Sequence, residues 1–177
     1  MIKMVFKEIR EILNQVKFAG EVVQLQALVV LMESPQFEEI EDKVKKSLNT
    51  PGEIEKLVNS KDWMERLALA DLLKITPDMP EELVKEAKKA AEKLSHDPMW
   101  AVKFVLAARS NIEPNFFKEI AEKLKKDKDW RVVMGLVFNE NTPDEITSWI
   151  EEHKKKVLEE LEELAYLQSL LQSLLRE

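Results

Sequence analysis

The chain has 177 residues, 45% hydrophobic and 34% charged, with 3 glycines, no cysteine and a formal net charge of −7. This length accommodates one domain with a sizeable core, and many helix formers with so few glycines predict an all-α fold. The missing cysteines exclude disulfides, thiolate nucleophiles and the common zinc and iron–sulfur ligand sets, and the acidic balance argues against generic nucleic-acid binding, which needs a basic surface.

Composition also bears on where the protein works. A chain without cysteine suits a reducing cytoplasm, and the N-terminus lacks the apolar core and cleavage site of a signal peptide, so we expect a cytoplasmic protein. Abundant lysine and glutamate are typical of a thermophile. The most apolar run, Val22–Met32, is about half the length that spans a bilayer, so we predict a buried helix and no membrane association.

The first 48 residues predict three helices. In residues 2–17 apolar side chains recur at three- and four-residue steps, which places them on one face of an amphipathic helix. Gly20 is predicted to end this helix, and Glu21–Glu33, apolar on nearly every side, is predicted to form a second helix sandwiched between neighbours. These two helices would form an N-terminal hairpin, and the segment "SPQFEEIEDKVKKSL" from Ser34 would add an outer helix.

A six-residue phrase occurs twice, as "NTPGEI" from Asn49 and as "NTPDEI" from Asn141. The residue before a proline is pushed out of the α region, the threonine hydroxyl can cap the next helix, and proline fits the first helical turn. The phrase therefore predicts a helix start. With degenerate copies included, the predicted starts lie at Pro51, Pro80, Pro114 and Pro143, at intervals of 29, 34 and 29 residues.

A second recurring element lies between these prolines. Each copy begins with an aspartate as the predicted N-cap, carries a tryptophan one to three residues later and continues as an apolar helix. Periods of this size predict stacked helical hairpins, because no such unit can bury its apolar face alone. The pairs are Asp62 with Trp63, Asp97 with Trp100, and Asp129 with Trp130.

The repeats resemble HEAT-like α-solenoids, in particular the leucine-rich repeat variant family, whose units are punctuated by Asn-Thr-Pro followed by an acidic and an aliphatic residue. The matching residues are Asn49–Ile54 and Asn141–Ile146, and the resemblance covers about residues 50–150. The repeats here are longer and irregular. Because the cysteine cluster of some family members is missing, no iron–sulfur function is carried over.

The resemblance implies an all-α fold, a right-handed α-α superhelix of about eight to ten helices, in one domain over residues 1–177. We expect N-terminal helices in residues 1–49, proline-started repeats in 50–150, a capping or oligomerising helix in 151–177, and no sheet. The helices are predicted to break near Gly20, Ser34, Asn49, Ser60, Pro77, His96, Asn111, Asp127 and Asn141.

Sequence motifs for catalysis are missing. His96 and His153 lie far apart in solvent-rich segments without a ligand partner at i,i+4, so they are interpreted as surface histidines and no metal is expected. The glycines are isolated, which excludes phosphate-cradling loops and dinucleotide fingerprints. We therefore predict a non-enzymatic protein without a cofactor.

Basic side chains are prominent on the second helices of the repeats. In HEAT-type stacks these helices line the concave face, where basic residues would suit an acidic peptide or helix of another protein. Alternatively, these residues form ion pairs with Glu65, Asp71 or the Glu-rich first helices. The candidate partner-binding residues are Arg66, Lys103, Arg109 and Arg131.

A nucleic-acid function is the alternative to a protein-interaction scaffold. HEAT-like DNA-repair glycosylases grip DNA with aromatic, aspartate and arginine side chains, and this chain carries such residues on its second helices. Those enzymes need a basic groove, whereas this chain is acidic. The sequence therefore favours a mostly buried, structural role for Trp63, Trp100 and Trp130.

The C-terminal segment forms a broad leucine stripe without a helix breaker. Such a helix either caps the last repeat or pairs with a second copy or a partner helix. We predict the cap and a monomer, with a homodimer through this helix as the alternative. The stripe comprises Val157, Leu158, Leu161, Leu164, Leu167, Leu170, Leu171, Leu174 and Leu175.

Overall fold

The computed structural model describes residues 2–176, without the side chains of residues 2–6, 164, 167, 168, 171, 172 and 176. Over the described range the chain is mostly helical, which confirms the predicted all-α character. The elements are α1 (Ile2–Met32), α2 (Pro35–Ser47), α3 (Glu53–Val58), α4 (Trp63–Leu72), β1 (Lys74–Ile75), α5 (Glu81–Leu94), α6 (Trp100–Arg109), β2 (Asn111–Ile112), α7 (Pro114–Leu124), α8 (Trp130–Phe138), α9 (Asp144–His153) and α10 (Lys155–Arg176).

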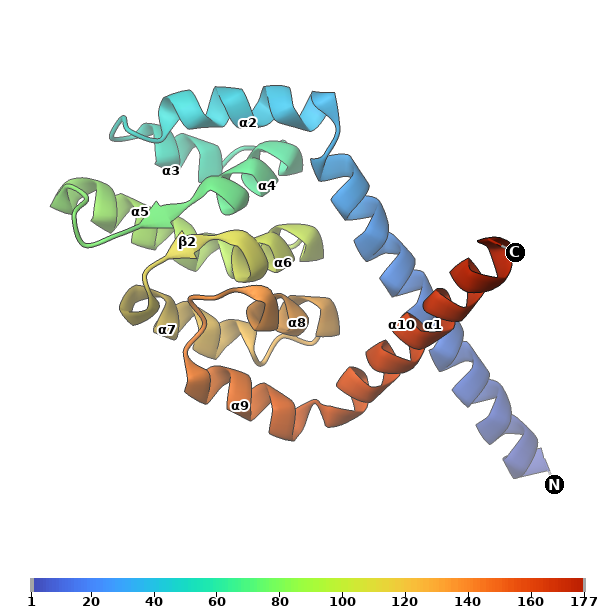
Figure 1. Ribbon diagram of the computed structural model, residues 1–177. Helices are drawn as coiled ribbons and strands as arrows, with labels where there is room; N and C mark the ends of the chain where they lie inside the picture. Colours follow the sequence, from blue (N-terminus) through green and yellow to red (C-terminus); the bar gives the residue numbers. More distant parts are fainter. Residues whose placement is uncertain (1, 177) are drawn as a thin grey trace.

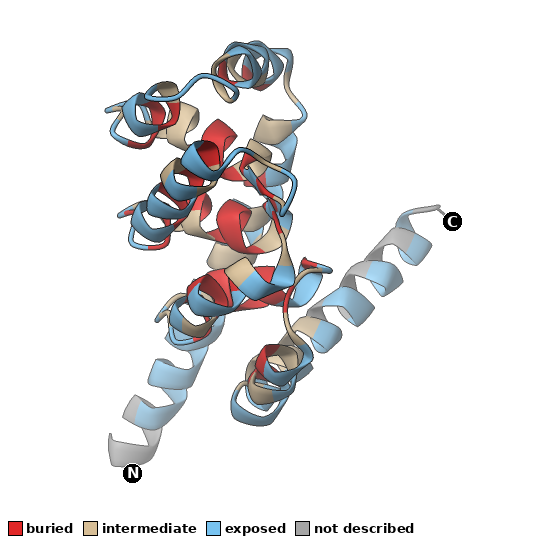
Figure 2. Cartoon of the chain, turned by 90° about the vertical axis from the view of Figure 1, so that its left-hand side faces the viewer, coloured by how far each residue is buried: buried red, intermediate tan, exposed pale blue. Residues whose placement is uncertain are grey.

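The helices between α1 and α10 lie in two layers (Figure 1). The inner layer is α2, α4, α6 and α8, in which each helix packs on the next. The outer layer is α3, α5 and α7, with α9 following below α8. Most residues of α6 and α8 and four consecutive residues of α4 are buried, whereas the outer helices bury only one side, as Figure 2 shows.

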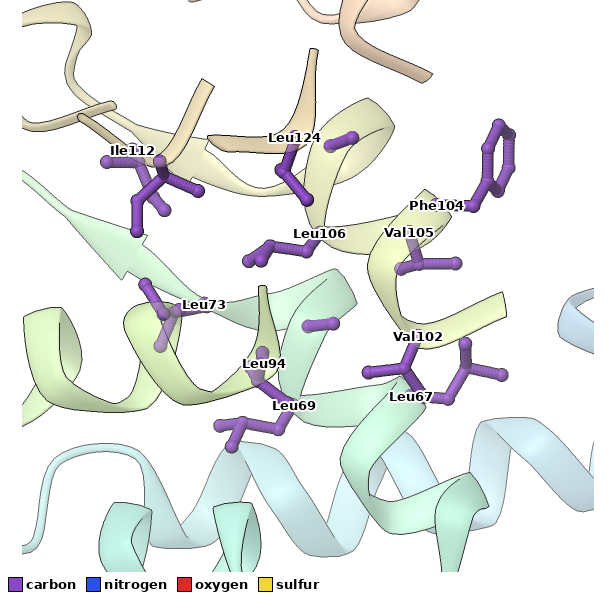
Figure 3. Close-up of a cluster of buried hydrophobic side chains, with 14 of the residues drawn as sticks. Leu67, Leu69, Leu73, Leu94, Val102, Phe104, Val105, Leu106, Ile112 and Leu124 are labelled. Atoms are coloured by element: carbon purple, nitrogen blue, oxygen red, sulfur yellow. The ribbon is translucent and has the colours of Figure 1, made fainter. Parts of the chain in front are cut away.

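The core runs continuously through both layers. Leu67 and Leu69 of α4, Leu106 of α6 and Leu124 of α7 are fully enclosed and lie in one cluster (Figure 3). Burial of each such side chain contributes about 1.5–3 kcal/mol before the entropy cost is subtracted. Because α4 and α6 are apolar on nearly every side, they are stable only between neighbours.

The prolines start helices as predicted. Pro114 is the first residue of α7, and Pro80 and Pro143 directly precede α5 and α9. Helix α3 begins two residues after Pro51, because Gly52 forms a left-handed turn with a φ of 89°. The predicted threonine cap is wrong at Thr142, whose hydroxyl donates to a carbonyl at the end of α8 and so closes the preceding helix.

The aspartate caps are confirmed at two of three sites. Asp62 and Asp129 accept the N–H of the second residue of α4 and α8 at 2.9 and 3.0 Å. Asp97 accepts instead from Met99, which precedes α6. The reason is that Pro98 and Met99 separate this aspartate from its helix, so it stabilises the turn.

A two-stranded parallel sheet corrects the expectation of no sheet. Strands β1 and β2 follow α4 and α6, and the N–H of Asn111 donates to the carbonyl of Leu73 at 3.0 Å. The links between inner and outer helices run side by side, with Ile75 and Ile112 buried. Their backbone groups pair because an unpaired buried N–H or C=O is costly.

The predicted N-terminal hairpin is wrong, because α1 continues through Gly20 as one helix of 31 residues. A glycine inside a helix costs only about 1 kcal/mol relative to alanine, too little to end a long helix by itself. Residues 21–33 are not sandwiched, since Leu28 is buried but Val23 and Val30 are exposed. The segment after Ser34 is also not an outer helix, because α2 packs on α4 in the inner layer.

The C-terminal helix covers the last unit only at its start. Leu158 and Leu161 pack against the core, but Tyr166, Leu170 and Leu174 are exposed, so the predicted full cap is wrong for these residues. The chain breaks after α9 and α10 leaves the stack (Figure 1). At about 1.5 Å per residue, α10 is more than twice as long as α9 and outruns the surface it could cover. The side chains of Leu164, Leu167 and Leu171 lie outside the described ones.

The crossing of α6 and α8 depends on Gly135. A Cβ atom there would lie 3.0 Å from the Cβ of Ala107 and 3.0 Å from the carbonyl oxygen of Phe104. We expect Gly135→Ala to lower the free energy of unfolding by about 1–3 kcal/mol, because overpacking forces the two helices apart. Urea unfolding followed by circular dichroism measures this change.

Gly20→Ala is the matched control. Gly20 has no neighbour within 4 Å, so alanine should raise stability by about 1 kcal/mol through its higher helix propensity. Equal effects of the two substitutions would contradict the close helix crossing.

Candidate functional site

Two ion pairs join successive inner helices at equivalent positions. Arg66 of α4 donates to both carboxylate oxygens of Asp97, in the turn before α6, at 2.7 and 3.3 Å. Lys103 of α6 donates to Asp127, in the turn before α8, at 2.6 Å. Both acids also accept the backbone N–H two residues further on, which closes the turn. Each pair therefore holds one unit to the next.

Arg131 of α8 connects the stack to α1. Its guanidinium donates to Asp129 at 2.8 Å and to the side chain of Gln24 at 2.7 Å. It also lies over the ring of Trp100, 3.7 Å from the centroid. Burial raises the pKa of Asp129, but the hydrogen bonds from Arg131 outweigh burial and hold this pKa below its ordinary value.

Arg109, at the end of α6, has a side chain that is 58% exposed. It donates to Asp71 of α4 at 2.5 Å, and Glu41 of α2 lies beside the same carboxylate. Burial, with the hydrogen bond and negative charge of Asp71, raises the pKa of Glu41 to about 7, against the opposing charges of Lys45 and Arg109. This surface therefore holds a carboxyl group that titrates near neutral pH.

The pair of Arg109 and Asp71 belongs to a larger surface. Asp71, Ala108 and Phe138 each lie eight residues after the tryptophan of their unit, so they occupy equivalent positions near the ends of α4, α6 and α8. Phe138 is 65% exposed, and Val137 beside it is exposed as well. We call Glu41, Asp71, Ala108, Arg109, Val137 and Phe138 the inner-face row. It combines carboxylates and a cation with an apolar side chain at one end.

The structure places the four predicted partner-binding residues in ion pairs. Arg66, Lys103 and Arg131 are largely enclosed with Asp97, Asp127 and Asp129, and Arg109 pairs with Asp71, as the alternative interpretation anticipated for that residue. A role in partner binding stays a prediction for all four. Sequence reasoning missed Glu41 and Phe138. The sequence carries no signal for Glu41, whereas the place of Phe138 at the end of an apolar helix could have indicated an exposed apolar residue.

The repeated tryptophans are partly buried and pack against the core. The ring of Trp130 lies 4.7 Å from that of Phe18 in α1, and the ring of Trp100 lies 6.4 Å from that of Phe104. These contacts agree with the structural role that the sequence predicted for Trp100 and Trp130. The indoles therefore do not form the exposed aromatic row that DNA binding would use.

Both histidines make local contacts. His96 lies 3.7 Å from Glu92 one helical turn earlier, and the ring of His153 stacks on Trp149 at 4.3 Å. Within the described part of the chain, no three histidine, aspartate or glutamate side chains gather as a metal site.

The terminal helices present apolar side chains to solvent. On α1 these include Ile12, Val16 and Val23, and on α10 they include Leu170 and Leu174. Of the residues described, Lys7–Met32 of α1 forms a helix long and apolar enough to cross a membrane, by length and composition alone. One face of this segment packs on the protein itself, through Leu28 and its neighbours.

No protein-family model, curated protein or solved structure matches the chain.

The enclosed pair of Arg66 and Asp97 should be essential for stability. We expect Asp97→Ala to lower the free energy of unfolding by about 3–5 kcal/mol, because it leaves a buried cation unpaired and opens the turn before α6. Asp97→Asn should cost less, since the amide oxygen still accepts from Met99. Chemical denaturation measures both.

The exposed pair of Lys85 and Glu81 supplies the control. Lys85→Ala should change stability by about 0–1 kcal/mol, as for other surface pairs. A loss at Asp97 no larger than this would show that the pairs between units carry no stability.

The raised pKa of Glu41 predicts that stability depends on pH. The folded state keeps this proton up to about pH 7, whereas the unfolded state releases it near the ordinary pKa of 4.5. The contribution is therefore fully present below pH 4.5 and is lost as the pH rises to 7. Glu41→Gln should remove this decline and raise stability above pH 7. Denaturation at a series of pH values tests this, and an unchanged decline in the variant would contradict it.

Proposed function

We propose that the protein is a HEAT-like α-solenoid that acts as a non-enzymatic scaffold for protein–protein interaction. The superhelical assignment is supported by the order of packing, since α2, α4, α6 and α8 each contact the next inner helix. Repeat proteins are stabilised by such nearest-neighbour contacts and offer an extended binding surface.

The single observation that carries the proposal is the exposed phenylalanine at the end of the inner-face row. Phe138 ends the buried helix α8, yet most of its surface is in water. Aromatic and arginine side chains are the residues that most often anchor protein interfaces. Arg109 supplies such a cation on the adjacent helix. The row thus suits a partner segment that brings an apolar side chain and a carboxylate.

Enclosure of the other cations weighs against the nucleic-acid alternative. Phosphate-backbone binding requires several accessible lysines and arginines, whereas Arg66, Lys103 and Arg131 are held by aspartates. The net charge of −7 acts in the same direction. A protein partner is therefore the better fit, and the exposed Arg109 is the group that would meet an acidic side chain of its segment.

The test has two steps. Proteins that bind the purified chain are isolated from a lysate of the source organism, and the recovered partner is then titrated as a purified protein. Phe138→Ala and Arg109→Glu are each expected to weaken this binding at least tenfold, because hot-spot residues contribute about 1.4 kcal/mol or more. Lys85→Glu, on the outer layer, is the control and should bind as the wild type does.

Two results would contradict the proposal. One is a partner whose affinity is unchanged by both substitutions in the inner-face row. The other is micromolar or tighter binding to DNA or RNA at about 100 mM salt, which would establish the nucleic-acid alternative.

A further inference from the structure

From Phe18 onward helix α1 has two faces with opposite environments, whereas residues 7–17 are exposed on every side. One face packs on the protein, with Phe18 against Trp130, Leu28 buried in the core and Gln24 bonded to Arg131. The opposite face is exposed along the whole described length of the helix, although it carries mostly apolar residues. The protein's own fold uses only the first face.

The exposed face follows a strict seven-residue repeat. Ile9, Val16, Val23 and Val30 recur every seventh position, and Ile2 extends the series in the sequence. Three residues after the first three of them come Ile12, Ala19 and Gln26. In coiled-coil notation the first set occupies the a positions and the second set the d positions. We call these residues the α1 seam: Ile9, Ile12, Val16, Ala19, Val23, Gln26 and Val30.

This period is informative because it differs from that of a straight helix. An α-helix has 3.6 residues per turn, so a stripe with a period of 3.5 drifts by about 20° per heptad unless the helix supercoils around a partner. Packing on a globular core imposes no such period. The seam keeps its period over three heptads from Ile9 to Val30, which is within the three to four heptads that predict a coiled coil.

We propose that a second copy of this chain covers the seam, and that two α1 helices form a parallel coiled coil. Isoleucine or valine at every a position is typical of parallel two-stranded pairs, in which leucine usually occupies d, whereas here the d positions are Ile12, Ala19 and Gln26. The inference is independent of the proposed scaffold function, because the seam and the inner-face row lie on different helices.

The available apolar surface is sufficient for a stable dimer. Val16, Val23 and Val30 are 63%, 61% and 68% exposed, and Ile9, Ile12, Leu13 and Val29 add to them. Seven such side chains offer on the order of 700 Å², close to the roughly 800 Å² that each partner buries in a standard interface. A helix of 31 residues is about 46 Å long, so the contact need not involve the helical stack.

The structure disfavours two other occupants. A bilayer would require α1 to detach, which would expose Leu28 and break the bond between Arg131 and Gln24. The first turns of α10 line a cavity of about 600 Å³ together with α1, and this cavity reaches the seam at Ala19. The other seam residues lie outside the cavity and are exposed, so a second molecule can reach them.

The test uses the full-length chain in sedimentation equilibrium. The wild type should dimerise at micromolar concentration, and Val16→Glu with Val23→Glu should weaken dimerisation at least 100-fold. Both positions are exposed, so circular dichroism should show an unchanged fold. Leu174→Glu, an equally exposed leucine on α10, should leave the dimer intact.

Cysteine cross-linking then tests the orientation in a chain that has no cysteine of its own. In a parallel pair, Ile9→Cys chains should form a disulfide with each other, since a residues face their own equivalents. A monomer at 100 µM, a dimer that survives the double substitution but not Leu174→Glu, or binding only to phospholipid vesicles would each overturn the proposal. In an antiparallel pair an a residue faces a d residue, so disulfides that form only between Ile9→Cys and Gln26→Cys chains would overturn the parallel arrangement.

Discussion

The structure depends on one constraint, which is that the inner helices α6 and α8 are apolar on nearly every side. Almost all residues of α6 from Ala101 to Ala107 are buried, and α8 is similar. Such a helix cannot face water on any side, so it needs an inner neighbour above, another below and an outer helix across. The stack of units, the close crossing at Gly135 and the need for covered ends all follow from this requirement.

Charged side chains connect the units, and this explains why so few remain available for a ligand. Arg66 and Lys103 occupy equivalent positions, and each holds the turn of the next unit through Asp97 or Asp127. Removal of one partner of an enclosed pair is costly because the other charge stays buried, although apolar residues in place of both would be about as stable. The geometry of the pair also fixes how one helix sits on the next. The inner-face row differs because Arg109 and Phe138 lie where the inner helices end, where Arg109 remains largely exposed although it pairs with Asp71.

The terminal helices show what happens where the stack stops. A repeat unit is covered by its neighbours, whereas α1 and α10 each extend well past the body they join (Figure 1). Only the part of each helix next to the stack is buried, at Leu28 in α1 and Leu158 and Leu161 in α10. Their remaining apolar residues are exposed and can bind a second molecule. The inner-face row instead combines charged side chains with an exposed phenylalanine.

Local signals in the sequence were enough to place most helix starts in the middle of the chain. Proline at Pro80, Pro114 and Pro143 and the caps at Asp62 and Asp129 act through backbone geometry within a few residues, so their effect does not depend on the rest of the fold. Long-range packing decided the continuation of α1 through Gly20, the pairing of β1 with β2, the position of α2 and the course of α10. It also selected Asp97 and Asp127 as partners of Arg66 and Lys103. These outcomes depend on which surfaces meet across 20 or more residues, and a pattern read along one segment contains no information about the segment that will pack against it.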